Sequence, residues 1–309
     1  MIEIGELDVI YISYDEPHKE YNWADLLNKC PWAKRVDRVK GFDAAHKAAA
    51  NLSETDHFIT VDGDNIVDVN FFDLTLPLEL DDTIYSWRGR NELNGLIYGN
   101  GGLKIWPKHI VEKMSTHETS KTDRLSVEFC WGLKYVQLRE CWSDVIVNGS
   151  PLQAFRVGFR EGVKLSMVNG LPYDGKMHEW RSRCWEGNVH RLQIWSTVGS
   201  HKENGLWAIF GARLGWWSSL IGKFDHSVIR DYEWFDHVFE GINVISDENF
   251  GEGSRQLNGM SLEEKIIWLG NELGNYFSLK LPLLDEKASD FFQSVMAVPL
   301  KHGDAAAES

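Results

Sequence analysis

Short apolar runs and amphipathic stretches alternate through the N-terminal part of the chain. Strand-like runs occupy residues 7–14, 33–39 and 57–61, and helix-like patterns occupy residues 22–28 and 43–52 between them. Apolar, β-branched runs of this length predict buried strands. Asp43 is the expected N-cap of the second helix. Because helices connect consecutive strands, this order predicts an α/β fold with a parallel sheet and right-handed crossovers.

The rest of the chain changes from strand-like to helical. Residues 83–88 and, less regularly, 126–147 are strand-like. Ser150 is a predicted helix N-cap, and Ser261 begins a capping box before the helix expected at residues 262–277. We therefore expect one domain over residues 1–215, a mainly helical C-terminal extension over residues 216–300, and a small, polar, disordered tail over residues 301–309.

An acidic tripeptide, Asp62-Gly63-Asp64, follows the third predicted strand. Its two carboxylates lie on the same side of an extended chain, and the glycine lets the backbone turn and a bulky anion approach. Two carboxylates at the end of a buried strand suit Mg²⁺ or Mn²⁺ carrying a diphosphate. An ordinary turn is the alternative, since Asp and Gly are common in turns. A calcium loop of the EF-hand type is excluded, because Val67 and Asp73 occupy its glycine and glutamate positions.

Composition narrows the class of protein. A chain of 309 residues can form one large α/β domain or two modest ones. The 14 tryptophans favour stacking on sugars or bases only weakly, because most tryptophans are core residues. Cys30, Cys130, Cys141 and Cys184 lack paired spacing, so we expect buried thiols and neither a disulfide framework nor a zinc site. The sequence has no run long enough to span a bilayer and no signal-peptide pattern, which predicts a cytoplasmic protein without a membrane partner.

The formal net charge is −14, which argues against attachment to nucleic acid over a broad surface. It leaves room for a local basic groove. Further along, the glycine pair Gly101-Gly102 is bounded by strand-like residues. Such a pair indicates either a group that approaches the backbone closely or a plain hairpin.

The segment from Gly41 to Lys47 precedes the acidic strand, and Asn100-Gly101-Gly102 follows it. Together these signals resemble GT-A glycosyltransferases over residues 5–110, in which a small-residue helix precedes an Asp-X-Asp strand and a glycine-rich donor loop follows. This resemblance implies a GT-A (Rossmann-like) mixed sheet flanked by helices. Four segments resemble more closely a glycosyltransferase group of tailed bacteriophages, over residues 8–215: Tyr11 to Pro17, Asn22 to Ala24, Pro31 to Val36 and Ala154 to Glu161.

That phage group is related to the TET/JBP-associated glycosyltransferases. The resemblance implies transfer of arabinose or glucose to hydroxymethylated pyrimidines, with double-stranded DNA as the acceptor and the host cytoplasm as the location. By position, Asp64 would bind Mn²⁺ or Mg²⁺, and Asp62 would share the metal or contact the donor ribose. The other implied donor-binding residues are Tyr14, Asp15 and Glu16 at the base, His46 and Lys47 at the donor, and Gly101 and Gly102 at the sugar and diphosphate of a UDP-sugar. A histidine would complete the metal site, with His201 preferred over His190.

Such a transfer either inverts or retains the sugar's configuration. An inverting reaction needs a base within hydrogen-bond reach of the acceptor hydroxyl, and Glu128, Asp144 and Glu186 occupy suitable regions. A retaining reaction needs no base of that kind. A nucleotidyltransferase and a non-catalytic sugar- or nucleotide-binding module are the alternative functions.

A DNA acceptor would need a flipped base held in a pocket and a rim that binds phosphates. Basic residues could form that rim or could simply be scattered surface charges. They are Lys34, Arg35, Arg38, Lys40, Arg88, Arg90, Lys104, Arg181 and Arg183.

Overall fold

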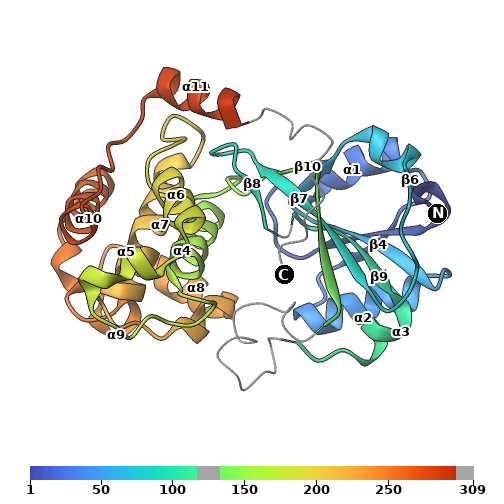
Figure 1. Ribbon diagram of the computed structural model, residues 1–309, viewed down its shortest axis with the longest axis horizontal. Coiled ribbons are helices and arrows are strands. Elements are labelled where there is room, and N and C mark those ends of the chain that lie inside the picture. The colour runs from blue at the N-terminus through green and yellow to red at the C-terminus, as the bar shows by residue number, and fades with distance from the viewer. Residues whose placement is uncertain (100, 117–132, 297–309) are drawn as a thin grey trace. The chain divides into compact units, whose positions relative to one another are not determined.

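The computed structural model of the protein describes residues 1–99, 101–116 and 133–296 (Figure 1). These residues form two compact units, one from residues 1–116 and 133–146 and the other from residues 147–295. The division falls earlier in the chain than the boundary expected at residue 215. Residues 147–215 belong to the same unit as the helices that follow them.

The first unit is built on a mixed sheet of eight strands, counted over the described residues. The spatial order is β3 (Lys34–Asp37), β2 (Asp8–Ser13), β4 (His57–Asp62), β9 (Leu103–Pro107), β7 (Ile84–Asn91), β10 (Tyr135–Val145) and β5 (Asn65–Val67), and β8 (Ile97–Tyr98) pairs with β7. A small separate sheet pairs β1 (Ile2–Glu3) with β6 (Thr75–Leu76).

Strand directions make the sheet mixed. β2 runs parallel to both β3 and β4, as the sequence predicts for the first three strands. β9 runs antiparallel to β4 and to β7. β10 is parallel to β7, and β5 is antiparallel to β10. The α/β class and the mixed sheet are therefore confirmed.

Both faces of this sheet are covered by helices. Val9 and Tyr11 of β2 pack with Leu26 of α1 (Lys19–Lys29). Ile10, between them, packs with Ala49 of α2 (Phe42–Leu52) on the opposite face, which α3 (Lys108–Lys113) also covers. Alternate side chains of a strand point to opposite faces, so a strand covered on both sides is apolar throughout. This packing explains the continuous apolar runs of β2 and β4.

The start of α2 differs from the prediction. Gly41, with a φ of 98°, is its N-cap residue, and no side chain caps this end. Asp43 instead accepts hydrogen bonds from the backbone N and the hydroxyl of Thr116, at 2.9 and 2.5 Å. The prediction of Asp43 as the cap is wrong because a distant partner takes its carboxylate.

The second unit is helical over the residues that the structure describes. Its helices are α4 (Pro151–Ser166), α5 (Trp180–Arg183), α6 (Glu186–Trp195), α7 (Gly205–Leu220), α8 (Tyr232–Glu240), α9 (Asp247–Phe250), α10 (Leu262–Phe277) and α11 (Glu286–Met296). Short 3₁₀ helices lie at Ile4–Glu6 and Val69–Asp73 in the first unit and at Met177–Glu179, His226–Arg230 and Ser254–Leu257 in the second.

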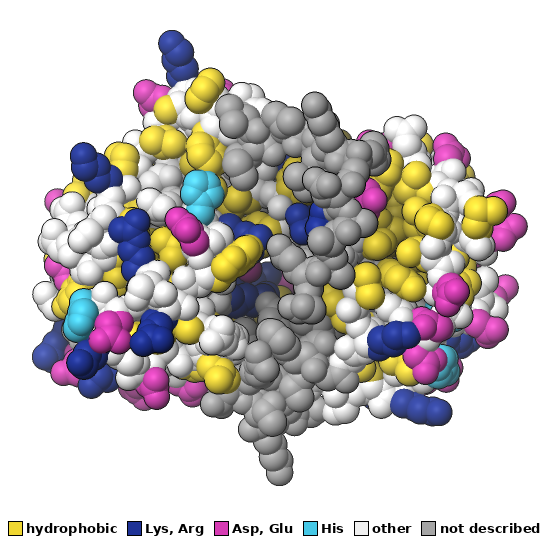
Figure 2. All heavy atoms as spheres, in the orientation of Figure 1, with side chains coloured by type: hydrophobic (Ala, Val, Ile, Leu, Met, Phe, Trp, Pro, Cys, Tyr) yellow, Lys and Arg dark blue, Asp and Glu magenta, His cyan; other side chains and the backbone are white. Residues whose placement is uncertain are grey.

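Two predicted caps are confirmed. The Ser150 hydroxyl accepts from Gln153 N at the start of α4, and Ser261 forms a capping box with Glu264 at α10. Within the described residues, none of the helices combines the length and the apolar character that crossing a bilayer would need. On the face seen in Figure 2, acidic and basic side chains are interspersed, so the acidic total does not give a surface of one sign.

Helices α4 and α7 pack with their backbones almost in contact. A Cβ on Gly158 would lie 2.1 Å from the carbonyl oxygen of Ala208, and one on Gly162 would lie 2.3 Å from that of Ala212. Such distances are below any van der Waals contact. Glycines at these positions therefore set the spacing of the two central helices of the unit.

Candidate functional site

The strand order of the sheet reverses beside β2. The chain passes from β2 to β3 on one side and then crosses to β4 on the other side. The carboxyl ends of β2 and β4 lie at the same edge, since the strands are parallel and Ile12 pairs with Asp62. Open α/β sheets bind ligands at such a reversal of strand order. The loops at this edge begin at Tyr14 and Gly63.

Three carboxyl groups meet at this edge. Burial and the charges of Asp62 and Glu16 raise the pKa of Asp64 to about 7. Burial also raises the pKa of Glu16. A Cβ on Gly63 would lie 2.6 Å from Glu16 Oε2, so the glycine lets the Glu16 carboxylate rest on the turn between the two aspartates. Asp62, Asp64 and Glu16 are therefore close enough for their charges to interact.

A buried lysine reaches one of these carboxylates. Lys104 Nζ lies 3.7 Å from Asp62 Oδ2, and the lysine side chain is 3% exposed while that of Asp62 is 41% exposed. Lys104 lies opposite Thr60 in the register of β4 and β9, and Thr60 is two residues before Asp62 on the same face of the strand. The buried lysine therefore partly neutralises the charge of Asp62, while the Asp62 carboxylate stays accessible to solvent.

An asparagine and a glycine complete the surroundings of the acidic motif. Asn65 Nδ2 donates to Asp64 Oδ1 at 2.8 Å, and its buried Oδ1 has no hydrogen-bond partner within the described part of the chain. Gly102 has a φ of +80°, and a Cβ there would lie 2.4 Å from Asn65 Nδ2 and 2.9 Å from Asp62 Oδ2. Asp62 N donates to Gly102 O at 3.0 Å. The structure thus places Gly102 directly on the acidic motif, and its predicted role in binding the sugar and diphosphate stays a prediction.

Gly101 is explained by packing. A Cβ on Gly101 would lie 2.2 Å from the backbone N of Gly89 in β7. Its own backbone N donates to Trp87 O at 3.0 Å. Backbone contact with β7 accounts for this glycine, and its predicted role in donor binding stays a prediction.

His46 is a buried residue of α2, the helix that precedes the strand of the acidic motif. Its Nδ1 lies 2.9 Å from Phe42 O, and because a carbonyl only accepts, Nδ1 carries the proton. Burial lowers the pKa of His46 to about 4, so the imidazole is neutral at pH 7. Its ring lies 4.0 Å from that of Phe42 and 4.9 Å from that of Trp106. Nε2 is buried and has no partner among the described residues, which leaves one acceptor available. Lys47, the next residue, is half-buried.

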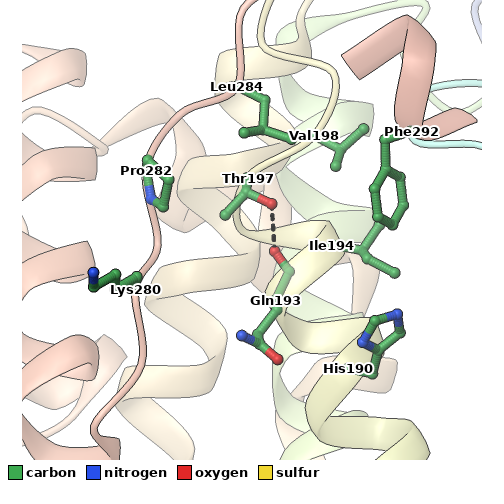
Figure 3. Close-up of a pocket in the computed structure, with 9 residues that line it drawn as sticks. All are labelled: His190, Gln193, Ile194, Thr197, Val198, Lys280, Pro282, Leu284 and Phe292. Atoms are coloured by element: carbon green, nitrogen blue, oxygen red, sulfur yellow. Dashed lines mark hydrogen bonds between the residues drawn. The ribbon is translucent and has the colours of Figure 1, made fainter. Parts of the chain in front are cut away.

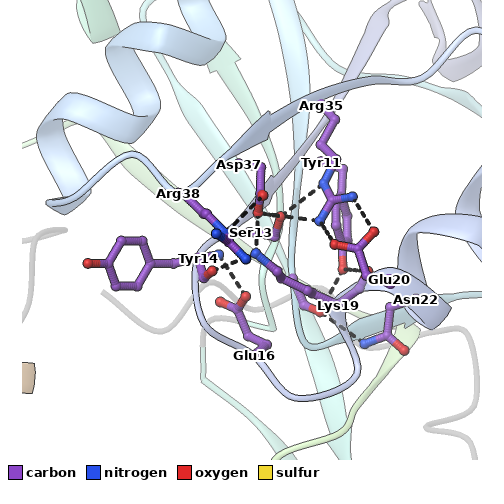
Figure 4. Close-up of polar contacts among 11 residues, drawn as sticks. Tyr11, Ser13, Tyr14, Glu16, Lys19, Glu20, Asn22, Arg35, Asp37 and Arg38 are labelled. Carbon is purple, nitrogen blue, oxygen red and sulfur yellow. Dashed lines mark hydrogen bonds and ion pairs between the residues drawn. The ribbon is translucent and has the colours of Figure 1, made fainter.

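Polar side chains around the ends of β2 and β3 hold the first loop in place (Figure 4). Glu16 Oε2 accepts from Tyr14 N at 2.7 Å. Lys19 Nζ donates to Tyr14 O at 2.7 Å and to Asp37 Oδ1 at 2.6 Å. The Ser13 hydroxyl donates to the same Asp37 oxygen at 2.7 Å. Tyr14 and Asp15, both predicted to face the base, lie exposed on this anchored loop.

The turn of the acidic motif is fixed from the other face of the sheet. Asn22 Nδ2 donates to Gly63 O at 2.9 Å. The Tyr11 hydroxyl lies 2.8 Å from the same carbonyl and 2.9 Å from Lys19 O. Four residues that build this site were not predicted to belong to it: Lys19, Asn22, Asp37 and Asn65. Lys104 was expected at a rim that binds phosphates, but its side chain is buried beside Asp62. The lysine at position 104 in an otherwise apolar strand was the one visible signal.

The three residues predicted as catalytic bases do not lie together at the acidic motif within the described part of the chain. Glu128 lies outside the described residues. Asp144 lies opposite Ile66 on β10, and its oxygens accept from Arg90 Nε at 2.5 Å and from Arg90 Nη2 at 2.8 Å. This ion pair stabilises the charged carboxylate and so makes Asp144 a weaker base. Its catalytic role stays a prediction, and Glu186 is exposed in the first turn of α6, in the second unit.

The candidate histidine ligands belong to the second unit. His201 Nε2 lies 3.4 Å from Asp290 Oδ1. His190, on α6, lines a cavity of about 250 Å³ with Gln193, Ile194, Thr197, Val198, Lys280, Pro282, Leu284 and Phe292 (Figure 3). The described lining residues of this cavity include no carboxylate, so it does not suit a divalent cation. The metal-binding role of His201 stays a prediction.

The described residues contain no group of three or more His, Cys, Asp or Glu side chains already arranged to hold a metal. Burial and the charge of Asp62 raise the pKa values of Asp64 and Glu16, but the oxygens of these three residues are not arranged around a single point as metal ligands would be. The chain was compared with protein-family models, with curated proteins and with solved structures, and none of them matches it.

Proposed function

We propose that the protein is a metal-dependent glycosyltransferase of the GT-A fold. It moves a sugar from a nucleoside-diphosphate sugar, with a UDP-sugar as the expected donor, to a hydroxyl acceptor. The observation that carries this proposal is the convergence of Asp62, Asp64 and Glu16 where the strand order reverses. A raised pKa in a cluster of acids at a ligand-binding edge is typical of a functional site.

Mn²⁺ or Mg²⁺ fits the residues at this edge. The available groups are hard oxygens, which both cations prefer. Burial raises the pKa of Asp64, and the charges of Asp62 and Glu16 raise it further. A cation would offset that second effect, and Oδ1 of Asn65, which has no partner among the described residues, adds a neutral oxygen to the set. Asp64 and Asp62 are the residues that would hold it. When bound, such an ion would neutralise the departing diphosphate.

The chain's own residues would position the donor. Gly102 lets the side chains of Asn65 and Asp62 lie directly against the backbone of the glycine-rich turn, which keeps that turn beside the acidic motif. His46 is buried, so its predicted contact with the donor would need the surrounding side chains to move. Tyr14 and Asp15 extend from a loop anchored by Lys19, which suits recognition of the base.

The acceptor is proposed from the sequence resemblance to phage glycosyltransferases. We expect 5-hydroxymethylcytosine in double-stranded DNA, carrying arabinose or glucose after transfer. Lys34 and Arg35, two of the expected rim residues, are engaged in ion pairs with Asp8 and Glu20. A phosphate rim built from these two residues would therefore have to compete with existing partners.

Donor hydrolysis tests the proposal. The protein is incubated with a panel of UDP-sugars and Mn²⁺, and UDP release is measured with and without hydroxymethylated DNA. We expect slow UDP release that D64N abolishes and that D73N, an exposed aspartate of the same unit, leaves unchanged. Mass spectrometry of nucleosides from the treated DNA identifies the sugar and the acceptor.

Two results would point to the alternative functions. Release of pyrophosphate from a nucleoside triphosphate and a sugar phosphate would make the protein a nucleotidyltransferase. Tight binding of a UDP-sugar without release of UDP under any condition would make it a binding module.

A further inference from the structure

An exposed tryptophan in the second unit contacts an arginine and a glycine of the following helix. Trp185 is 54% exposed and immediately precedes α6. The guanidinium carbon of Arg191 lies 4.8 Å from the centre of its ring. A Cβ on Gly187 would lie 2.5 Å from ring atom Cη2, so the glycine backbone lies against the indole. The indole therefore contacts Arg191 and Gly187, and about half of its surface faces solvent.

The surroundings of Trp185 are basic in an otherwise acidic chain. Residues 176–191 contain four Lys and Arg residues and two Glu residues, whereas the whole chain has a formal net charge of −14. Arg181 and Arg183 are exposed on α5, the short helix just before the tryptophan. Arg181 also donates to the carbonyls of Phe277 and Ser278, at 3.3 and 3.5 Å, so its side chain is tied to the end of α10.

A flat π surface with one guanidinium at its ring and two more arginines within four residues along the chain matches one ligand chemistry in particular. Single-stranded nucleic acid is bound by aromatic side chains that stack on bases and by cations that contact phosphates. Neutral carbohydrate also stacks on tryptophan, but it lacks the negative charge that exposed arginines attract. The guanidinium of Arg191 beneath the indole adds a cation–π contact that keeps the ring in place.

We propose that Trp185, with Arg181, Arg183 and Arg191, is a contact surface for a nucleic-acid strand. A base stacks on the solvent-facing side of the indole, and the exposed arginines contact the neighbouring phosphates. Strand binding itself is independent of sugar transfer, and only the further step, that the bound strand belongs to the acceptor DNA, rests on the proposed function.

Fluorescence anisotropy of a labelled oligothymidylate of about a dozen nucleotides tests the surface, with the full chain and without donor or metal. Replacement of an aromatic residue that stacks on a base weakens binding by at least about fivefold. We expect this loss for W185A and retention of most of the affinity for W185F. R183Q should reduce the slope of log K against log salt by about 1, while W185A should leave that slope unchanged.

Matched variants separate this surface from general effects. Tyr276, 48% exposed on α10, and Arg255, which is exposed and paired with Asp247, lie in the same unit. Y276A and R255Q should bind the strand as tightly as the natural chain does. Because no donor is present, a failure of the glycosyltransferase proposal would appear as absent UDP release and would leave strand binding intact.

Three results would overturn the inference. The first is W185A binding as tightly as the natural chain, and the second is an equal loss for Y276A. The third is displacement of the oligonucleotide by a neutral oligosaccharide, which would assign the surface to carbohydrate.

Discussion

Replacement of Asp64 by Asn should stabilise the protein in the absence of metal. The pKa of Asp64 rises from an ordinary value of 3.8 to about 7, and each pKa unit corresponds to about 1.4 kcal/mol. The full rise corresponds to about 4 kcal/mol, and because Asp64 is only partly buried, residual hydration reduces the effect to about 2–4 kcal/mol. Asn is neutral and keeps an oxygen that can accept from Asn65.

The pH dependence follows from the direction of the shift. Between pH 4 and pH 7 the folded protein holds the Asp64 proton that the unfolded chain has released, as the raised pKa requires. Stability therefore falls as pH rises through this window and then levels off. D64N lacks this loss, so its advantage should grow by about 1–3 kcal/mol between about pH 4.5 and pH 8.

Urea unfolding in EDTA, at both pH values and for both proteins, measures the effect. The difference between the two proteins isolates Asp64 from other groups that titrate, including Glu16. Added Mn²⁺ should stabilise the natural chain and leave D64N unchanged, since a ligand stabilises only the state that binds it. An advantage of D64N that is absent at pH 8, or equal at both pH values, would refute the reasoning.

Three further substitutions test other parts of the structure. G102A should lower stability by about 1–3 kcal/mol and reduce UDP release, because its Cβ would meet Asn65 Nδ2 at 2.4 Å at a φ of +80°; urea unfolding and the donor assay measure the two effects. R213M should destabilise the second unit by about 3 kcal/mol in thermal unfolding, because the buried Arg213 guanidinium donates to the carbonyls of Ser196, Ile266 and Leu281. The exposed R255M should change the melting temperature little. G158V should prevent native packing of α4 on α7, seen as loss of the cooperative transition, because a Cβ would lie 2.1 Å from Ala208 O.

Hydrophobic alternation and local capping chemistry were enough to predict much of the fold. The strands at β2 and β4, the helix α2 between β3 and β4, and the capping box at Ser261 follow from residues close together in the sequence. The antiparallel direction of β9 could not be predicted, because it depends on the end of the sheet at which the chain enters the strand. The capping role expected of Asp43 failed for a related reason, since Thr116 lies far along the chain.

The candidate site was predictable in part. Asp62, Asp64 and Gly102 come together as expected, because a strand end and a glycine-rich turn carry recognisable signals. Lys19, Asn22 and Asp37 carry no signal in the sequence, since their roles depend on which strands become neighbours. The buried Arg213 is likewise explained only by three carbonyls that different segments supply.

Binding of Mn²⁺ together with UDP tests the central claim most directly. Calorimetric titration of UDP into the protein with Mn²⁺ should show one site in the natural chain and in D73N, and none in D64N or when Mn²⁺ is replaced by EDTA. Equal binding of UDP by D64N and the natural chain, or binding that is indifferent to Mn²⁺, would contradict a metal–diphosphate site at Asp62-Gly63-Asp64.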